Sequence, residues 1–202
     1  MKDKQLTHFD FPKDMLQELL RAGYGKLEIG YYDLPDGDKM VATYTQMPHC
    51  SGEMVNWWFG SYLTNTQSYQ LWHPDHTTFR WNDQKKPGTC VGATHISEEV
   101  LGGETVPMEI TFFDSADLFD PADLERGKIR CALTAEIRKP DGTLYAMFLH
   151  IVRETYYGCE MRNRFWLIHC DEAGAAGLMQ HNLEEMGNLA EILPRLYHNQ
   201  NR

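Results

Sequence analysis

The segment that most constrains the fold is a long helical pattern near the C-terminal end, from Glu172 to Tyr197. Its apolar residues recur along one broad face, so this face must pack against another layer. Glu185 falls inside that apolar arc, and His181 lies at its border, four residues earlier on the same side. A carboxylate that faces a core is costly unless it is paired or binds a metal ion. The helix alone leaves three interpretations open: Glu185 reaches past the helix edge, pairs with an arginine, or binds a metal.

Upstream of this helix the sequence is dominated by strand patterns. Alternating residues and Gly- or Asp-containing turns predict strands over 25–33, 39–47, 90–100, 108–114, 128–138, 144–155 and 159–170. Short helices are predicted over 12–21 and 53–63, and two extended pieces on either side of Pro74 within 68–81.

This order of elements predicts an α+β fold, in which a curved antiparallel sheet grips the long C-terminal helix. The space between sheet and helix is a natural pocket for a small molecule. We expect a single domain over residues 1–202, with 1–24 as an N-terminal helical extension and 25–202 as the domain that carries the activity.

Composition narrows the classes of function. With 42% hydrophobic residues the chain can form a globular core. Its net charge of −10 argues against nucleic acid and anionic membranes as partners. We find no secretory signal and no run of about 18 apolar residues. The five cysteines are an odd number without a CxxC pair, which predicts reduced thiols and a cytoplasmic setting. A homodimer is compatible with these features.

Potential metal ligands concentrate at four places in the chain. They are WHPDH (His73, His76), THISEE (His95, Glu98, Glu99), FLHIVRE (His150) and the helix pair His181 and Glu185. Histidines and carboxylates are the usual ligands of a catalytic zinc ion. Each histidine alone is more often a hydrogen-bonded structural residue, so the clusters by themselves are a weak signal.

Several longer motifs resemble those of a known family. PHCSGEMVNWWFGSYL, YQLWHPDH, VGATH followed by EE and GG, GCEMRNRFWL, and the final HN.EEM pattern are similar to the 2,4-diacetylphloroglucinol hydrolase and phloretin hydrolase family, from about residue 46 to 197. The resemblance implies a Bet v 1-like helix-grip fold and a zinc-dependent hydrolase that removes an acyl group from a polyphenol ring by cleaving a carbon–carbon bond.

The resemblance also implies which residues hold zinc. It places two ligands, His181 and Glu185, on the last helix, and a histidine and a glutamate on strands. Glu99 matches the glutamate because it precedes the glycine pair by two residues, while Glu98 would point to the other face of its strand. His76 is our choice for the histidine, and His73 is the alternative.

From the same resemblance, His150 corresponds to the catalytic histidine. The sequence also predicts substrate contacts at Tyr69, Trp72, His73, Phe165 and Asn182. Alternatives stay open at three of them: Tyr69 as a residue of a strand face, Trp72 as core packing, and Asn182 as the partner of a neighbouring side chain. Phe165 stands where the family has a tyrosine that binds the substrate carbonyl. The expected substrate is a small phenolic or β-diketone-like compound. Two alternatives are a non-catalytic carrier of small molecules and a metal-dependent polyketide cyclase or lyase.

Overall fold

The protein forms one curved antiparallel sheet in the computed structural model, which describes residues 11–200. The strands lie in the order β1-β2-β8-β7-β6-β5-β4-β3. Their bounds are β1 Gly30–Asp33, β2 Lys39–Pro48, β3 His76–Trp81, β4 Thr94–Leu101, β5 Glu104–Phe113, β6 Ile129–Arg138, β7 Leu144–Thr155 and β8 Gly158–Leu167. Every neighbouring pair is antiparallel.

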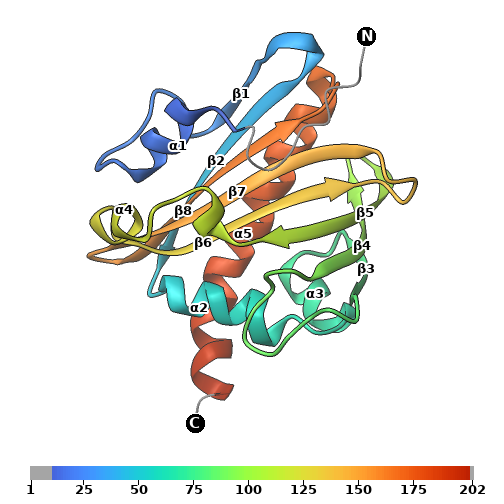
Figure 1. The fold of residues 1–202 in the computed structure, drawn as a ribbon. Coiled ribbons are helices and arrows are strands. Elements are labelled where there is room, and N and C mark those ends of the chain that lie inside the picture. Colours follow the sequence, from blue (N-terminus) through green and yellow to red (C-terminus); the bar gives the residue numbers. More distant parts are fainter. Residues whose placement is uncertain (1–10, 201–202) are drawn as a thin grey trace.

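The long helix α5 (Glu172–Gln200) lies along the inner face of this sheet (Figure 1). The shorter helices are α1 Lys13–Leu20, α2 Gly52–Trp57, α3 Thr66–Trp72 and α4 Pro121–Arg126, with a π-turn at Trp58–Tyr62 and 3₁₀ turns at Pro35–Gly37 and Ser115–Asp117. The predicted curved sheet around a C-terminal helix is therefore confirmed. Among the described residues, no helix is both long enough and apolar enough to cross a membrane.

The inner core forms where α5, α2 and α3 pack on the sheet. The buried residues of α5 are Ala175, Leu178, His181, Asn182, Glu185, Met186, Leu189 and Leu193. The sequence pattern thus placed Glu185 correctly on the side that faces the sheet. Because this face carries three polar residues among apolar ones, it must supply them with partners inside the core.

Local differences from the predicted elements have clear physical causes. Residues 66–72 form α3 rather than an extended piece, because Asn65 caps the helix by accepting from the Ser68 amide, and the Ser68 hydroxyl lies within reach of the Asn65 amide. The predicted strand over 25–33 is reduced to β1, which starts at Gly30. The predicted extension over residues 1–24 lies partly outside the described residues; within them, α1 is present.

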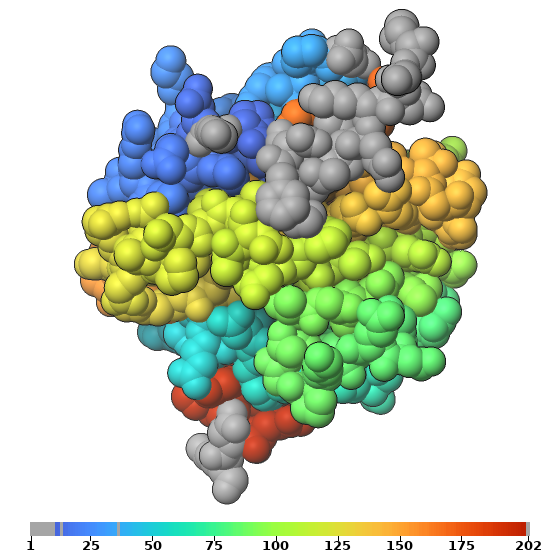
Figure 2. Space-filling view, viewed as in Figure 1, coloured from blue at the N-terminus to red at the C-terminus, as the bar shows by residue number. Residues whose placement is uncertain are grey.

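A second core covers the outer face of the sheet. Met147, Leu149 and Ile151 of β7 pack there against Leu19 of α1 and Phe119 in the segment before α4. Figure 2 shows the N-terminal segment, in blue, beside the yellow-green segment around α4 on this face. The middle of the sheet is therefore buried on both faces, which explains why β7 is apolar on both sides instead of alternating.

Buried arginines hold the N-terminal segment to this outer face. Arg162 is fully buried and donates to Glu28 at 2.6 Å and to the Leu19 carbonyl at 3.1 Å. Arg164 donates to the same carboxylate at 3.1 Å. The alternation of Arg162, Asn163 and Arg164 in the sequence predicts structural ion pairs with Glu160 or Glu136 across the sheet. That prediction is wrong, because the carboxylate that neutralises both arginines comes from the loop before β1. Burial raises the pKa of Glu28, but the Arg162 and Gly25 hydrogen bonds and the Arg164 charge outweigh it and lower the pKa to about 2.

The substitution Glu28→Gln tests this anchor. It removes the charge that two buried guanidinium groups share, so we expect the free energy of unfolding near neutral pH to fall by about 3 kcal/mol in urea titrations. The matched control is Glu125→Gln, which breaks the exposed ion pair with Arg130 and should change stability little.

The same anchor predicts a pH dependence. The folded-state pKa of Glu28 lies below its ordinary value of 4.5, so the ionised carboxylate stabilises the fold above pH 4.5, and this contribution is lost as the pH falls toward 2. The stability difference between wild type and Glu28→Gln should therefore shrink over that window. A difference that stays constant across the window would show that Glu28 does not act through its charge.

Candidate functional site

A narrow, mostly apolar cavity lies between α5 and the inner face of the sheet. Its walls include the aromatic side chains Phe59, Trp72, Phe112, Tyr145, Phe148 and Phe165, and its ionisable side chains are His95, Glu99, His150, His181 and Glu185. An apolar cleft with a few convergent polar groups is the usual form of a small-molecule site. This cavity is therefore the candidate functional site.

Two imidazole–carboxylate pairs lie beside this cavity. Nε2 of His76 lies 3.5 Å from Oε2 of Glu185, and Nε2 of His181 lies 3.4 Å from Oε2 of Glu99. In each pair a residue of the sheet faces a residue of the helix. His76 and Glu99 stand opposite each other on β3 and β4, and His181 and Glu185 come from α5, so we call the arrangement crossed. The structure thus brings together the four residues that the sequence suggested as ligands.

Hydrogen bonds behind the two strand residues fix their orientation. Nδ1 of His76 lies 3.0 Å from the Tyr69 carbonyl, and because a carbonyl only accepts, Nδ1 carries the proton. Nε2 of His76 is then the nitrogen with the free lone pair. The Tyr69 ring stacks on His76 at 3.8 Å, and its hydroxyl donates to Oε1 of Glu99. Tyr69 therefore supports both a histidine and a carboxylate of the site.

The chemistry of these four side chains suits a metal ion such as zinc, and two of the separations between them can be compared with a tetrahedral site. Nε2 of His76 and Nε2 of His181 are buried and have no hydrogen-bond partner among the described residues. For ligand bonds of about 2.0–2.2 Å, neighbouring ligand atoms of a tetrahedral zinc site lie about 3.3–3.6 Å apart. The separations of 3.4 and 3.5 Å match this spacing. Two imidazoles and two carboxylates are also a ligand set that zinc accepts.

The two carboxylates of the site favour positive charge at His181. Burial lowers the pKa of His181, but the adjacent Glu99 carboxylate and the charge of Glu185 outweigh burial and raise it. Burial likewise raises the pKa of Glu99, and the neighbouring His181, His76 and Tyr69 outweigh that and lower it. The carboxylates therefore favour a cation at this place, whether a proton or a metal ion.

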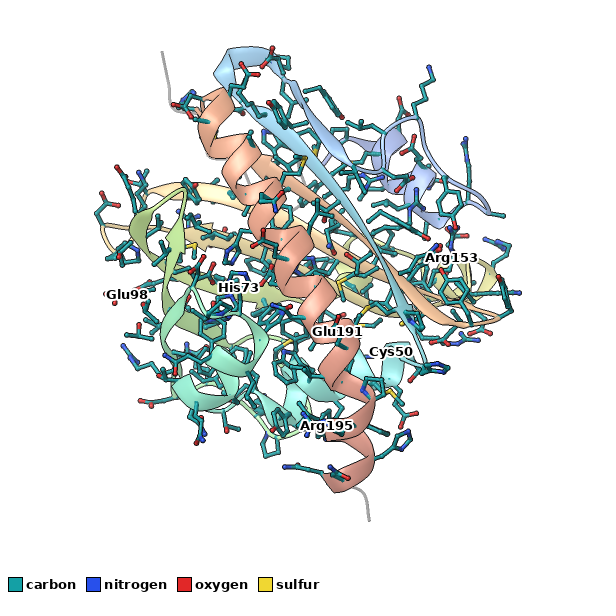
Figure 3. All side chains as sticks on the ribbon, turned by 180° about the vertical axis from the view of Figure 1, so that it is seen from behind. Cys50, His73, Glu98, Arg153, Glu191 and Arg195 are labelled. Atoms are coloured by element: carbon teal, nitrogen blue, oxygen red, sulfur yellow. The ribbon has the colours of Figure 1, made fainter. Side chains whose placement is uncertain are left out.

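His73 lies at the edge of the same cluster. Its ligand atom lies within 4.8 Å of those of His76 and His181, so the three histidines also form a potential metal group. Its Nε2, however, lies 3.4 Å from the exposed carboxylate of Glu184, and the side chain does not line the cavity. Figure 3 shows His73 next to the middle of α5, whereas Glu98 lies at the outer margin of the sheet.

His150 lines the cavity from β7, away from these pairs in sequence. Its ring stacks on Phe148 at 4.3 Å, and its Nδ1 lies 2.7 Å from Oδ1 of Asn163. Burial lowers the pKa of His150 to about 4, although the Glu185 charge and the Asn163 hydrogen bond raise it. The imidazole is therefore neutral near pH 7 and available to accept a proton.

The residues expected to contact substrate fall into two groups. Trp72 and Phe165 line the cavity, and the indole nitrogen of Trp72 is buried without a hydrogen-bond partner among the described residues. Tyr69 also lines the cavity, but its hydroxyl donates to Glu99. Asn182 lies outside the lining and donates to Glu185. His73 stays outside the lining, as described above.

Two polar residues of the cavity lining, His95 and Tyr145, were given no specific role from the sequence, although His95 was among the potential metal ligands. His95 projects from β4 on the same face as Glu99, and its Nε2 is buried without a partner in the described part of the chain. The alternation of β4 gave a signal for it, because residues two or four apart in a strand share a face. Tyr145 of β7 also lines the cavity, and no local pattern distinguished it from a surface tyrosine.

The chain matches a protein-family model over residues 11–171, and the family is described as the DAPG hydrolase PhiG domain. The match ends before α5, so it bears on the strand half of the site. The chain is also 26% identical over 200 residues to phloretin hydrolase from Eubacterium ramulus, covering 84% of this chain and 71% of that protein.

Solved structures with a similar fold include proteins of the Bet v 1-like type. Major latex-like protein 151 from Panax ginseng has a TM-score of 0.56 at 8% identity, covering 78% of this chain and 98% of that one. Ara h 8.0201 has a TM-score of 0.53 at 8% identity, covering 78% and 98%. The Bet v 1-like helix-grip fold predicted from the sequence is thereby confirmed; at this identity the likeness concerns the fold alone.

Proposed function

The chain belongs to the DAPG hydrolase family, and from this premise we propose that it is a metal-dependent hydrolase that cleaves a carbon–carbon bond next to a carbonyl group. The substrate class is an acylphloroglucinol-like phenol or a related β-diketone, which agrees with the similarity to phloretin hydrolase. We assign this activity to residues 25–202 as one domain. The observation that carries the proposal is the crossed arrangement of two buried imidazole–carboxylate pairs beside an aromatic cavity.

His76, Glu99, His181 and Glu185 would hold the metal ion, and zinc is the ion that suits these ligands. When bound, such an ion supplies Lewis acidity toward a carbonyl oxygen and toward water. The two carboxylates neutralise a divalent charge in a site that water reaches poorly, so the ligand set offsets the cost of burying the ion. Tyr69 and the β3–β4 pairing hold two of the ligands in place.

His150 is the group that moves a proton in this proposal. Hydrolysis joins the oxygen of water to the acyl carbon and breaks the bond from that carbon to the ring, whose electron pair stays on the ring carbon. One proton from the water must reach that ring carbon. A neutral imidazole can take up this proton and deliver it within the same cycle, so His150 serves first as base and then as acid.

The aromatic walls would bind and orient the phenol ring. Phe148 and Phe165 flank His150, with ring centroids 4.3 and 5.6 Å from the imidazole, so a ring held against them lies near the proton-transfer group. Phe165 offers no hydroxyl at the place where the family resemblance implies a tyrosine. A substrate carbonyl must therefore find its polar contacts elsewhere in the cavity. A simple carrier of apolar ligands would not need two buried imidazole–carboxylate pairs, whose burial is costly.

The first test concerns the ligands. We expect His76→Ala to lower zinc affinity by more than about 100-fold, which exceeds the effect usual for residues that only support a ligand. His73→Ala should leave the stoichiometry at wild-type level, because His73 has a partner in Glu184. Metal analysis and calorimetric titration of both proteins, after identical removal and return of zinc, measure this. If His73→Ala loses the metal and His76→Ala keeps it, the assignment of the strand ligand is wrong.

The second test concerns the reaction. His150→Gln should lower kcat on acylphloroglucinols by about 10²–10⁴-fold, the usual contribution of a general acid–base group, with the metal content unchanged. His198→Gln is the matched control, since His198 is exposed near the end of α5 and should behave as wild type.

Turnover in isotopically labelled water must place the solvent oxygen in the released acid. A product without the label would identify a lyase or cyclase instead of a hydrolase.

A further inference from the structure

A row of polar side chains crosses the inner face of the sheet beneath α5. Thr43 of β2 stands opposite Asn163 of β8, and Asn163 stands opposite His150 of β7. Asn182 of α5 meets this row, and Thr43, Asn163 and Asn182 are fully buried. Their neighbours on the same strand faces are mainly apolar, so four adjoining polar groups at this depth must satisfy one another.

The hydrogen bonds run without interruption from His150 to Glu185. Nδ1 of His150 lies 2.7 Å from Oδ1 of Asn163, whose Nδ2 donates to Oδ1 of Asn182 at 2.8 Å and to the Thr43 hydroxyl at 2.9 Å. Thr43 in turn donates to Oδ1 of Asn182. Nδ2 of Asn182 donates to Oε1 of Glu185 at 2.6 Å. Two amides therefore connect the proposed acid–base group to a proposed metal ligand.

The carboxylate at one end fixes the direction of every bond in this chain. An ionised carboxylate only accepts, so Asn182 must turn its NH₂ group toward Glu185 and its oxygen toward Asn163. Asn163 must then turn its NH₂ group toward that oxygen, because the opposite orientation would place two acceptors against each other. The oxygen of Asn163 is left facing His150, so Nδ1 of His150 must carry a proton. In a neutral imidazole the other nitrogen, Nε2, is then the acceptor.

We propose that Asn163 and Asn182 are positioning residues that hold His150 in the tautomer with its proton on Nδ1, so that Nε2 keeps the lone pair that accepts the proton of the reaction. The inference rests on the proposed function and adds the reason why His150 begins the cycle as a base. Glu185 has a double role in it. Its Oε2 faces His76, and its Oε1 sets the donor-to-acceptor direction of the hydrogen bonds through the two asparagines.

The tautomer can be read directly by NMR of the full-length, zinc-loaded protein labelled with nitrogen-15 at histidine. Protonated and unprotonated ring nitrogens have well-separated shifts, and the His150 signals are those that disappear in His150→Gln. We expect the protonated type at Nδ1 and the unprotonated type at Nε2. A proton on Nε2 alone in the wild-type protein would overturn the proposal, and this measurement needs neither a substrate nor a stable variant.

Two substitutions at one position separate positioning from general structural support. Asn163→Leu removes the acceptor, so the proton should shift to a mixture of Nδ1 and Nε2 and kcat should fall about 10–100-fold with KM little changed, the size of effect usual for a group that orients another. Asn163→Asp keeps an acceptor and should keep the proton on Nδ1. If Asn163→Leu retains a single tautomer with the proton on Nδ1, Asn163 does not set it, and the proposal fails.

Thr45→Val and Thr43→Val provide a matched pair of controls. Both remove a hydroxyl from the inner face of β2, but the Thr45 hydroxyl has no hydrogen-bond partner among the described residues, whereas that of Thr43 belongs to the chain. Thr45→Val should leave the His150 signals unchanged, and Thr43→Val should shift them. Equal shifts in both would point to a general change in packing and contradict the proposal.

A protein with the expected tautomer that hydrolyses no acylphenol would overturn the proposed function and support this inference.

Discussion

The burial of the Glu185 carboxylate is the constraint on which both halves of the site depend. A carboxylate in the interior is tolerated only when each oxygen has a partner, because an unpaired buried charge costs several kcal/mol. Here Oε2 faces His76 and Oε1 accepts from Asn182. One further residue along α5 would turn the side chain by about 100° around the helix axis and separate it from both. The apolar packing of Met186, Leu189 and Leu193 therefore sets the geometry of the site as well as the fold.

The packing on the outer face of the sheet supports this inner arrangement. Along β8, Asn163 points to the cavity side, while Arg162 and Arg164 point to the other side and bind Glu28. The N-terminal segment held by that ion pair covers Leu149 and the other outer residues of β7, so water is excluded from both faces of these two strands. Hydrogen bonds between side chains are stronger in such surroundings than in water. The ion pairs of Glu28 and the hydrogen bonds of Asn163 therefore lie on opposite faces of the same strand. Both depend on the alternation of side chains along the backbone.

The features that sequence could predict are those with a local period. The helical period placed Glu185 on the buried side of α5 and His181 at the border of that side. The family resemblance pointed to Glu99, and the period of two in a strand put Glu98 on the opposite face. The same rule could have selected Asn163, a polar residue between Met161 and Phe165 on the inner face of β8. Its charged neighbours, Arg162 and Arg164, hide this signal, because they indicate structural ion pairs along the whole segment.

The features that the sequence could not predict depend on contacts between residues that are far apart in the chain. Glu28 pairs with Arg162 across more than a hundred residues, and nothing in the local pattern before β1 marks it as the partner of a buried cation. Extended chain was expected around Pro74, yet the Asn65 cap made the preceding residues helical, and this helix carries the Tyr69 hydroxyl to Glu99. The direction of the hydrogen bonds through Asn163 and Asn182 is even harder to predict from the sequence. An asparagine offers a donor end and an acceptor end with equal ease, so its direction is decided only where the chain meets a group that cannot donate. In this fold that group is Glu185, and its charge therefore bears on the proton of His150, a residue it does not touch.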